Sequence, residues 1–292
     1  MDKFTLKVHT SIYPAIDSTR VELPPRFTVC IIGGSAGIGE HIAYAYAHAR
    51  ASAIIIASRS LEPLKKVAET CRAVNPECNL GIFQCDINSS SSVAALASHI
   101  QMQHGRLDVL ISNPAYAGPV TLKVTEGDPA EFQKCFDVNI MGTYHAAHYF
   151  IPLLLSSDNG ANTFITIGSL AACIIQGPIA NTGYCISKMA QSRFTEFLTE
   201  QYADEGLLSI NVHPGAVATE MAKGNTPEEF LPYLTDDVDL CGGFLVWLTR
   251  STKKMQWLNG RFVSATWDVE ELLSRKDEIV AKDMLKWKMA TA

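Results

Sequence analysis

The chain has 292 residues, of which 47% are hydrophobic and 18% charged, and its formal net charge is −6. These values are typical of a folded globular protein and exclude a disordered or fibrous one. No run reaches the roughly 20 uninterrupted apolar residues of a membrane helix. No basic run supplies the phosphate contacts by which proteins bind nucleic acid. We therefore expect neither a membrane nor nucleic acid as a partner.

The N-terminal segment, residues 1–26, is polar, ends in Pro24-Pro25 and has no periodicity that would bury one face. We expect an extended arm that lies over the rest of the protein. Lys3 and Lys7 stand where a secretory signal needs apolar residues, so we expect a cytoplasmic protein. The eight cysteines form no C-x-x-C pair, which favours buried reduced thiols and predicts no metal site.

From residue 27 onward, short apolar runs alternate with longer helical stretches. The predicted strands are 27–32, 53–57, 80–85, 107–111, 163–167, 207–212 and 260–265. The predicted helical stretches are 38–50, 61–73, 90–104, 128–155, 181–204 and 236–250. Continuous apolar strands are typical of a parallel sheet that is covered on both faces. We predict one α/β domain, residues 27–292, with a doubly wound, seven-stranded, mostly parallel sheet and helices on both faces.

Two segments of this domain stand outside the alternation. Residues 216–235 form a long irregular insertion that we expect to act as a lid, because ligands bind at the strand ends in such sheets. The tail, residues 267–292, has apolar residues at helical spacing. The tail either packs on a partner subunit, or covers the pocket, or forms a solvated surface helix.

The turn after the first predicted strand is rich in glycine and opens a helix. It reads Gly33-Gly34-Ser35-Ala36-Gly37-Ile38-Gly39. Glycines at 33, 37 and 39 allow the backbone to turn sharply and to approach a pyrophosphate, whose charge is met by the helix N-terminus. A tight turn without a ligand would use the same residues. The position of the string favours dinucleotide binding, with contacts at Gly33, Ser35, Gly37, Ile38 and Gly39.

The spacing G-x-x-x-G-x-G resembles that of the short-chain dehydrogenase/reductase family, in the subfamily with a Tyr-x-x-x-Lys active site. The resemblance implies a Rossmann-like sheet and a nicotinamide dinucleotide. It also implies cofactor contacts after the third strand, at Asp86 and Ile87, and after the fourth, at Asn113. The family turn reads N-N-A-G at the fourth strand, so Ser112 and Pro114 depart from it.

The end of the second predicted strand indicates which dinucleotide binds. An acidic residue there hydrogen-bonds the ribose hydroxyl of NAD, whereas an arginine accommodates the 2′-phosphate of NADP. The segment Ser58-Arg59-Ser60 holds no carboxylate. We therefore predict NADP(H), in contact with Ser58 and Arg59, and NAD(H) as the less favoured choice. The alternative is that Arg59 only caps a surface loop.

A tyrosine and a lysine four residues apart, Tyr184 and Lys188, stand near the start of the stretch 181–204. This spacing places them on one helix face. A free phenol has a pKa of about 10, and a neighbouring ammonium lowers that pKa by stabilising the phenolate. Tyr184 can then exchange a proton with a substrate oxygen. The same spacing also occurs by chance on amphipathic helices.

Three further segments match the resembled family in chain order. Ser169 ends a strand 15 residues before Tyr184, and the family serine hydrogen-bonds the substrate oxygen. Asn139 matches an asparagine that holds a water in a proton relay to the lysine, and Lys188 matches the lysine that also holds the nicotinamide ribose. In the family, the turn after the sixth strand carries a threonine that contacts the nicotinamide. Here Pro214, Gly215, Val217 and Thr219 match that turn.

Together the matches imply reversible hydride transfer between NADP(H) and a carbon that bears a hydroxyl or carbonyl, with Tyr184 as general acid or base. The candidate pocket wall has no Arg or Lys to clamp a carboxylate or phosphate, which favours a bulky, largely apolar ketone or secondary alcohol. The wall residues are Tyr116, Ile174, Ile175, Met221, Phe230, Leu231 and Tyr233. For each of these residues, the alternative is that it belongs to the hydrophobic core and does not line the pocket.

The chain is also similar to fungal members of the family that tailor secondary metabolites. The resemblance implies a homodimer or homotetramer. Two other functions remain open from the sequence: a non-catalytic NADP-binding sensor or scaffold, and an isomerase or dehydratase on the same fold. The joint presence of Asn139, Ser169, Tyr184 and Lys188 favours the oxidoreductase.

Overall fold

A computed structural model describes residues 4–289. Residues 1–3 of the predicted arm and 290–292 of the predicted tail lie outside the described residues. A seven-stranded sheet with strand order β3-β2-β1-β4-β5-β6-β7 forms the centre of the molecule, and every strand pair is parallel. The strands are β1 (Thr28–Ile32), β2 (Ala53–Ser58), β3 (Asn79–Gln84), β4 (Val109–Ser112), β5 (Thr163–Ile167), β6 (Leu208–His213) and β7 (Phe262–Ser264).

The predicted helices connect these strands, and short helices surround them. The α-helices are α1 (Gly37–His48), α2 (Leu61–Val74), α3 (Ser90–His104), α4 (Pro129–Phe136), α5 (Gly142–Leu155), α6 (Thr182–Tyr202), α7 (Glu220–Asn225), α8 (Asp239–Thr249), α9 (Thr252–Met255), α10 (Val269–Ser274) and α11 (Lys276–Ala281). The shorter helical segments are η1 (Pro14–Ile16), η2 (Ser18–Arg20), η3 (Val124–Glu126), η4 (Asp137–Met141), η5 (Leu170–Cys173), η6 (Glu228–Tyr233) and η7 (Gln256–Leu258).

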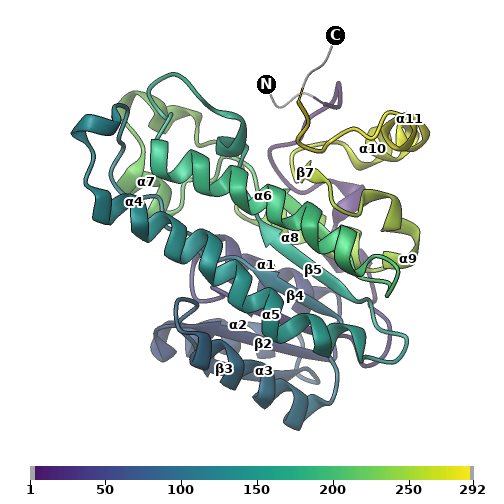
Figure 1. Cartoon of the computed structure of the whole chain (residues 1–292). Helices are drawn as coiled ribbons and strands as arrows, with labels where there is room; N and C mark the ends of the chain where they lie inside the picture. The colour runs from purple at the N-terminus through teal and green to yellow at the C-terminus, as the bar shows by residue number, and fades with distance from the viewer. Residues whose placement is uncertain (1–3, 290–292) are drawn as a thin grey trace.

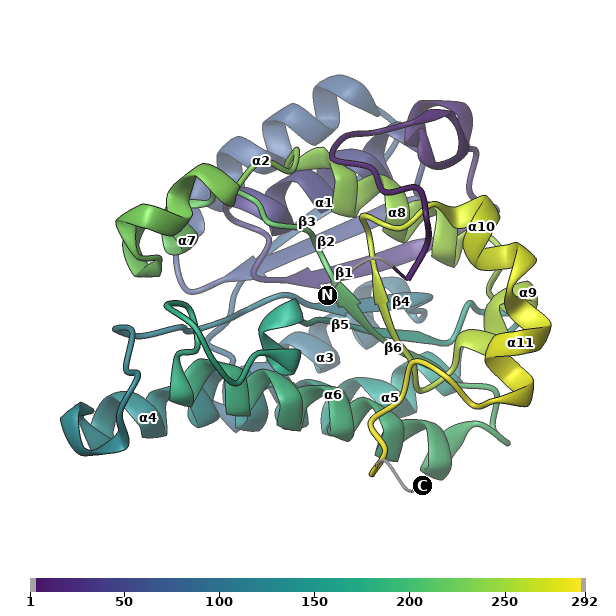
Figure 2. The same ribbon diagram turned by 90° about the horizontal axis from the view of Figure 1, so that it is seen from above.

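Helices cover both faces of the sheet (Figures 1 and 2). Ile31 of β1 belongs to the core beneath α1, α2 and α8, whereas Cys30 and Ile32 belong to the core beneath α3, α5 and α6. Strands β1, β4 and β5 are buried at every position because apolar residues on both faces meet helices. The predicted doubly wound fold is confirmed.

The predicted helical stretch 128–155 is present as one continuous helical segment, and a π-helical turn lies within it. The π-helical turn η4 separates α4 from α5, and the N–H of Gly142 donates to the carbonyl of Asp137. Inside this turn the buried side chain of Asn139 hydrogen-bonds the backbone of Tyr116. These bonds hold the extra residue of the turn in place.

The predicted lid, residues 216–235, is less irregular than its glycines and prolines indicate. It contains α7 and η6, and the Thr219 hydroxyl caps α7 by accepting from the N–H of Ala222 at 3.1 Å. The two ends of the segment meet, because the Ala216 N–H donates to Asp236 Oδ2 at 2.6 Å and the Asp236 N–H to the Ala216 carbonyl at 3.1 Å. Its action as a lid stays a prediction.

The N-terminal arm and the C-terminal tail pack on each other, which none of the three alternatives for the tail anticipated. Val8 forms a β-bridge with Trp267, and His9 Nε2 lies 2.8 Å from Asp268 Oδ2. Leu272 and Ile279 of the tail are fully buried in the core of the same chain. The apolar stripe of the tail is therefore partly buried within its own chain, while Leu273 stays 41% exposed.

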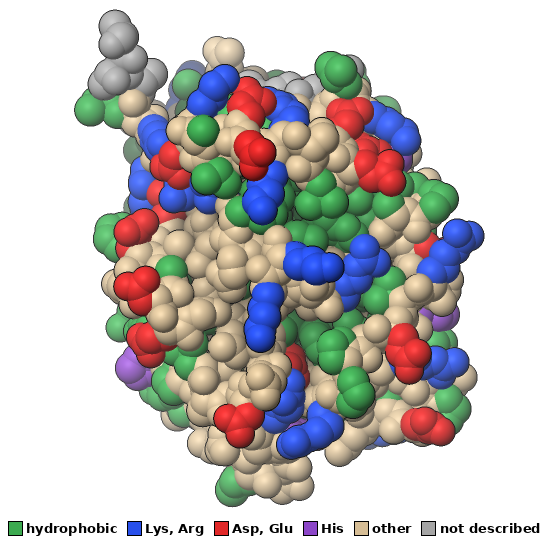
Figure 3. Space-filling view, turned by 90° about the vertical axis from the view of Figure 1, so that its right-hand side faces the viewer, with side chains coloured by type: hydrophobic (Ala, Val, Ile, Leu, Met, Phe, Trp, Pro, Cys, Tyr) green, Lys and Arg blue, Asp and Glu red, His purple; other side chains and the backbone are tan. Residues whose placement is uncertain are grey.

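The end of the molecule that carries α9, α10 and α11 is shown in Figure 3, where Lys and Arg side chains lie along the middle of the face. This end is opposite α4 and α7 (Figure 2). All eight cysteines are free, and seven of them are buried. None of the helices formed by residues 4–289 is long and apolar enough to cross a membrane.

Candidate active site

The glycine-rich turn after β1 has the geometry that its residues predict. Gly33 has φ of +83° and Gly37 of +56°, both in the region that favours glycine. A Cβ on Gly39 would lie 2.1 Å from the carbonyl oxygen of Gly33. Asn113, at the end of β4, donates from Nδ2 to that same oxygen at 2.9 Å. The turn and the end of β4 are thus joined beside the N-terminus of α1.

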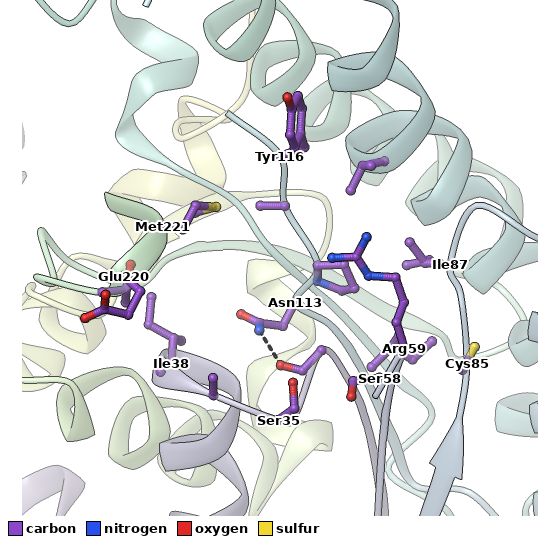
Figure 4. A pocket seen from close by; sticks show the side chains of 18 of the residues that line it. Ser35, Ile38, Ser58, Arg59, Cys85, Ile87, Asn113, Tyr116, Glu220 and Met221 are labelled. Carbon is purple, nitrogen blue, oxygen red and sulfur yellow. Dashed lines mark hydrogen bonds between the residues drawn. The ribbon is translucent and has the colours of Figure 1, made fainter. Parts of the chain in front are cut away.

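A cleft of about 540 Å³ opens at this place (Figure 4). It lies where β1 and β4 are neighbours in the sheet, which is the point at which doubly wound sheets bind ligands. The predicted cofactor residues on its wall are Gly33, Ser35, Gly37, Ile38, Ser58, Arg59, Asp86, Ile87, Asn113, Val217 and Thr219.

The other predicted cofactor residues are not part of this wall. Gly39 packs on Gly33, and Pro214 and Gly215 are buried. Tyr184 and Lys188 stand on α6 and are also outside this wall. Sequence reasoning missed several residues that do line the cleft, among them Cys85, Asn88 and Glu220. Cys85 and Asn88 flank the predicted Asp86, so their position at a strand end was the available signal.

Three charged side chains line the cleft: Arg59, Asp86 and Glu220. Arg59 is exposed at the end of β2 and its guanidinium points into the cleft toward Asn113 (Figure 4). The Asp86 carboxylate accepts from the backbone N–H of Asn88 at 3.0 Å. Among residues 4–289, the one basic group on this wall therefore stands where the sequence predicted it.

Ser169, Tyr184 and Lys188 come together at the carboxyl end of β5. Ser169 lies close enough to Tyr184 to lower the pKa of its phenol, and the Ser169 hydroxyl accepts from the Ala171 N–H at 3.1 Å. Lys188 Nζ lies 5.8 Å from the centroid of the Tyr184 ring. It donates to the carbonyl of Ile167, the last residue of β5, at 2.8 Å. A strand end and one face of α6 thus build the group.

Burial sets the proton equilibria of this group. Burial raises the pKa of Tyr184 from 10.0 to about 12, and this effect outweighs that of Ser169, which lowers the pKa. It lowers the pKa of Lys188 from 10.5 to about 7. The expectation that the ammonium lowers the tyrosine pKa is wrong for this structure, because each side chain loses hydration and favours its neutral form. Tyr184 is held as a protonated phenol, the form that donates to a carbonyl oxygen.

Asn139 does not line the cleft. It is connected to Tyr184 and Lys188 by a hydrogen bond to α6. Its Oδ1 accepts from the Tyr116 N–H at 2.8 Å, and its Nδ2 donates to the Tyr116 carbonyl at 2.9 Å and to Ser187 Oγ at 2.8 Å. Ser187 immediately precedes Lys188. The four predicted catalytic residues therefore belong to one connected cluster, and Tyr116 is tied to it by its main chain.

The predicted pocket wall is divided in the structure. Tyr116 and Met221 line the 540 Å³ cleft, whereas Ile174 and Ile175 line a separate cavity of about 500 Å³. Phe230 and Tyr233 face each other within η6, with ring centroids 5.1 Å apart. Leu231 lies between them in the same segment.

Comparison with known proteins agrees with this geometry. The sequence profile of the short chain dehydrogenase family matches residues 27–229. The chain is a short chain dehydrogenase. Two relatives extend the match to nearly the whole chain. The short chain dehydrogenase pgmD of Aspergillus terreus is 40% identical and the match covers 98% of this chain and 94% of that protein. The short chain dehydrogenase citE of Monascus ruber is 36% identical, with 97% and 95% covered.

Solved structures share the fold of this dehydrogenase. A 7α-hydroxysteroid dehydrogenase in complex with NADH and 7-oxo glycochenodeoxycholic acid has a TM-score of 0.73 at 21% identity, over 87% of this chain and 96% of that chain. A short chain dehydrogenase from Escherichia coli CFT073 in complex with NADPH has a TM-score of 0.71 at 25% identity, over 86% and 99%. As a member of the family, the chain is an oxidoreductase that uses NAD(P) and acts on small molecules.

Proposed function

We propose that this dehydrogenase interconverts a ketone and a secondary alcohol on a bulky, largely apolar small molecule, with NADP(H) as its cofactor. The observation that carries the proposal is the grouping of the Ser169 and Tyr184 hydroxyls beside the buried amine of Lys188. Two hydroxyls and an amine in this arrangement can bind a carbonyl oxygen and supply its proton.

The residues of the cleft fit a dinucleotide with a 2′-phosphate. The close packing of Gly39 on Gly33 lets the backbone approach a pyrophosphate at the start of α1. Arg59 is the one basic residue on the wall of the cleft within the part of the chain that the structure describes, and a guanidinium pairs well with a phosphate. The E. coli structure in complex with NADPH, at 25% identity, supports the same choice.

In the proposed reaction the bound cofactor supplies or accepts the hydride. The protein handles the oxygen and the proton. The hydroxyls of Ser169 and Tyr184 hydrogen-bond the carbonyl oxygen, and Tyr184 donates its proton from Oη as the alcohol forms. The amine of Lys188 holds the nicotinamide ribose. The raised pKa of Tyr184 keeps the phenol protonated near neutral pH, and this is the form that donates to a carbonyl oxygen.

The surroundings of the site favour an apolar substrate. Tyr116 and Met221 lie on the wall of the cleft, and Met221 is 39% exposed. A cavity of about 390 Å³ next to α4 and the start of α6 is lined mainly by small and apolar residues such as Val124 and Phe132. With fungal relatives at 36–40% identity, we place the substrate among the polyketide, terpenoid or steroid-like metabolites of secondary metabolism.

The proposed assembly is a homodimer or homotetramer in the cytoplasm. The outer faces of α5 and α6 expose Tyr144 (48%), Met189 (46%) and Phe197 (56%), and large apolar side chains on one face are typical of subunit contacts. The free cysteines fit a reducing compartment.

Tyr184→Phe tests the proposal because it removes only the hydroxyl. We would titrate the parent and the variant with NADPH and with NADH by nucleotide fluorescence, then screen apolar ketones and secondary alcohols by absorbance of the nicotinamide. We expect both proteins to bind NADPH alike and the variant to lose roughly 10²–10⁴-fold in kcat. NADPH binding by the parent without turnover of any substrate class would instead support a sensor. Turnover by Tyr184→Phe at the parental rate would refute the assignment of the proton donor.

A further inference from the structure

The amine of Lys188 has a second hydrogen-bond partner that the sequence analysis did not consider. Gln191, one helical turn later on α6, is fully buried. Its Oε1 accepts from Lys188 Nζ at 3.0 Å. Its Nε2 donates to the carbonyl of Asn139 at 2.9 Å and to Thr143 Oγ1 at 2.8 Å. One amide therefore bridges the lysine to the π-helical turn.

The orientation of this amide is fixed by its partners. The Asn139 carbonyl can only accept, so it requires the NH₂ group of Gln191, and the Lys188 ammonium can only donate, so it requires the oxygen. The Thr143 hydroxyl donates to the Asn139 carbonyl at 2.8 Å and therefore accepts from Gln191. Rotation of the amide by 180° would place donor against donor and acceptor against acceptor.

The same contacts occupy Asn139 completely. Its carbonyl accepts from Gln191 and Thr143. Its side chain uses the oxygen and both N–H groups on Tyr116 and Ser187. A carbonyl oxygen with two lone pairs and two donors has no capacity for a third partner. The expected water between Asn139 and the lysine thus has no binding group at Asn139.

We propose that Gln191 is a positioning residue that holds the amine of Lys188 in the place where the resembled family uses a water bound to its asparagine. The proposal rests on the proposed function for its catalytic consequence. An amide does not pass a proton on as water does. Gln191 keeps Nζ beside Tyr184 and stabilises its charged form.

The pKa of Lys188 can report on its hydrogen bond to Gln191, because few other charged groups surround the amine. Burial alone accounts for the lowered pKa of Lys188, and its neighbour on the same helix face is Tyr184. The titratable or charged side chains on the elements packed against this part of α6 are Cys173 in η5, Glu131, Lys134 and Cys135 in α4, Asp137 in η4 and His213 in β6. Among residues 4–289, no carboxylate forms a salt bridge with Lys188 Nζ. A change at Gln191 will therefore act on the amine directly.

The test follows Lys188 itself in protein labelled with ¹³C at the lysine Cε, without substrate. The signal that Lys188→Met removes identifies the residue. Gln191→Glu places a carboxylate at the amine and should move the titration midpoint up by about one pH unit or more. Gln191→Leu removes an acceptor from the charged form and should move the midpoint down.

Thr195→Val is the matched control, because Thr195 is equally buried one turn further along α6 and donates to the Gln191 carbonyl, not to its amide. It should leave the midpoint in place. With a reducible ketone in hand, the pH profile of kcat should shift in the same direction as the midpoint in each Gln191 variant. Parental midpoints in both folded Gln191 variants would overturn the proposal. Shifted midpoints in a protein that reduces no ketone would retain it and refute the proposed function.

Discussion

The buried amine of Lys188 predicts a specific dependence of stability on pH. Its pKa is 10.5 in an exposed lysine and about 7 in the folded protein. Below pH 7 both states hold the proton, and the folded state carries the full cost of burying the charge. Between pH 7 and 10.5 the unfolded chain holds the proton and the folded chain does not. Stability from this group therefore rises with pH across that window and is constant above it.

The size of the effect follows from the shift. Each pKa unit corresponds to about 1.4 kcal/mol, so the contribution of Lys188 changes by roughly 3–5 kcal/mol between pH 7 and 10.5. Lys188→Met keeps the length of the side chain and removes the titration. It leaves the Ile167 carbonyl and Gln191 Oε1 without a donor, at a cost of about 1–3 kcal/mol each that does not depend on pH. The difference in free energy of unfolding between variant and parent should thus favour the variant most below pH 7.

Urea unfolding of the cofactor-free protein, followed by tryptophan fluorescence at intervals from pH 6 to 9.5, measures this difference. Taking the difference between two proteins removes the contribution of all other titrating groups that both share. The variant should lose its relative advantage at up to about 1.4 kcal/mol per pH unit. Lys254→Met, at an exposed lysine of α9, is the control and should show a flat difference. A flat difference for Lys188→Met as well would refute the reasoning from burial.

Three further outcomes are expected. Arg59→Ala should lower kcat/KM for NADPH by about 10–100-fold, because it removes a hydrogen bond to a charged group, and should leave kcat/KM for NADH nearly unchanged. Steady-state rates with the two cofactors measure this ratio. An unchanged ratio would mean that Arg59 only caps a surface loop. Gly39→Ala brings a methyl to 2.1 Å from the Gly33 carbonyl, so nucleotide fluorescence should show strongly weakened NADPH binding, and parental affinity would contradict the role of the turn. Phe197→Glu places a charge on a side chain that is 56% exposed on α6; light scattering should show a smaller assembly if α6 forms the contact, and an unchanged mass would exclude that face.

The fold was predictable because its signals are local. Strands β1, β4 and β5 are buried at every position and consist mostly of apolar residues, a pattern that predicts a buried parallel sheet. The glycine-rich turn was predictable for a similar reason: Gly33 and Gly37 occupy backbone conformations that other residues avoid. Tyr184 and Lys188 share a helix face whatever the rest of the chain does.

The features that escaped prediction depend on contacts between distant residues. The arm packs on the tail through pairs such as Val8 and Trp267. The periodicity of the tail does not indicate that the arm is its partner. The pKa values of Tyr184 and Lys188 follow from how deeply the fold buries them, which their spacing does not express. Gln191 is polar on a buried helix face, but only the packing of α6 on the π-helical turn shows what its amide binds.

The π-helical turn explains how the cofactor cleft and the proton donor are kept in register. Asn139 holds both the N–H and the carbonyl of Tyr116, on the wall of the cleft, and also the hydroxyl of Ser187, next to Lys188. A regular helix from 128 to 155 would contain no extra residue at this point and would turn Asn139 away from one of these partners. The π-helical turn therefore couples the wall of the cleft to the face of α6 that carries Tyr184, so that neither can shift without breaking buried hydrogen bonds.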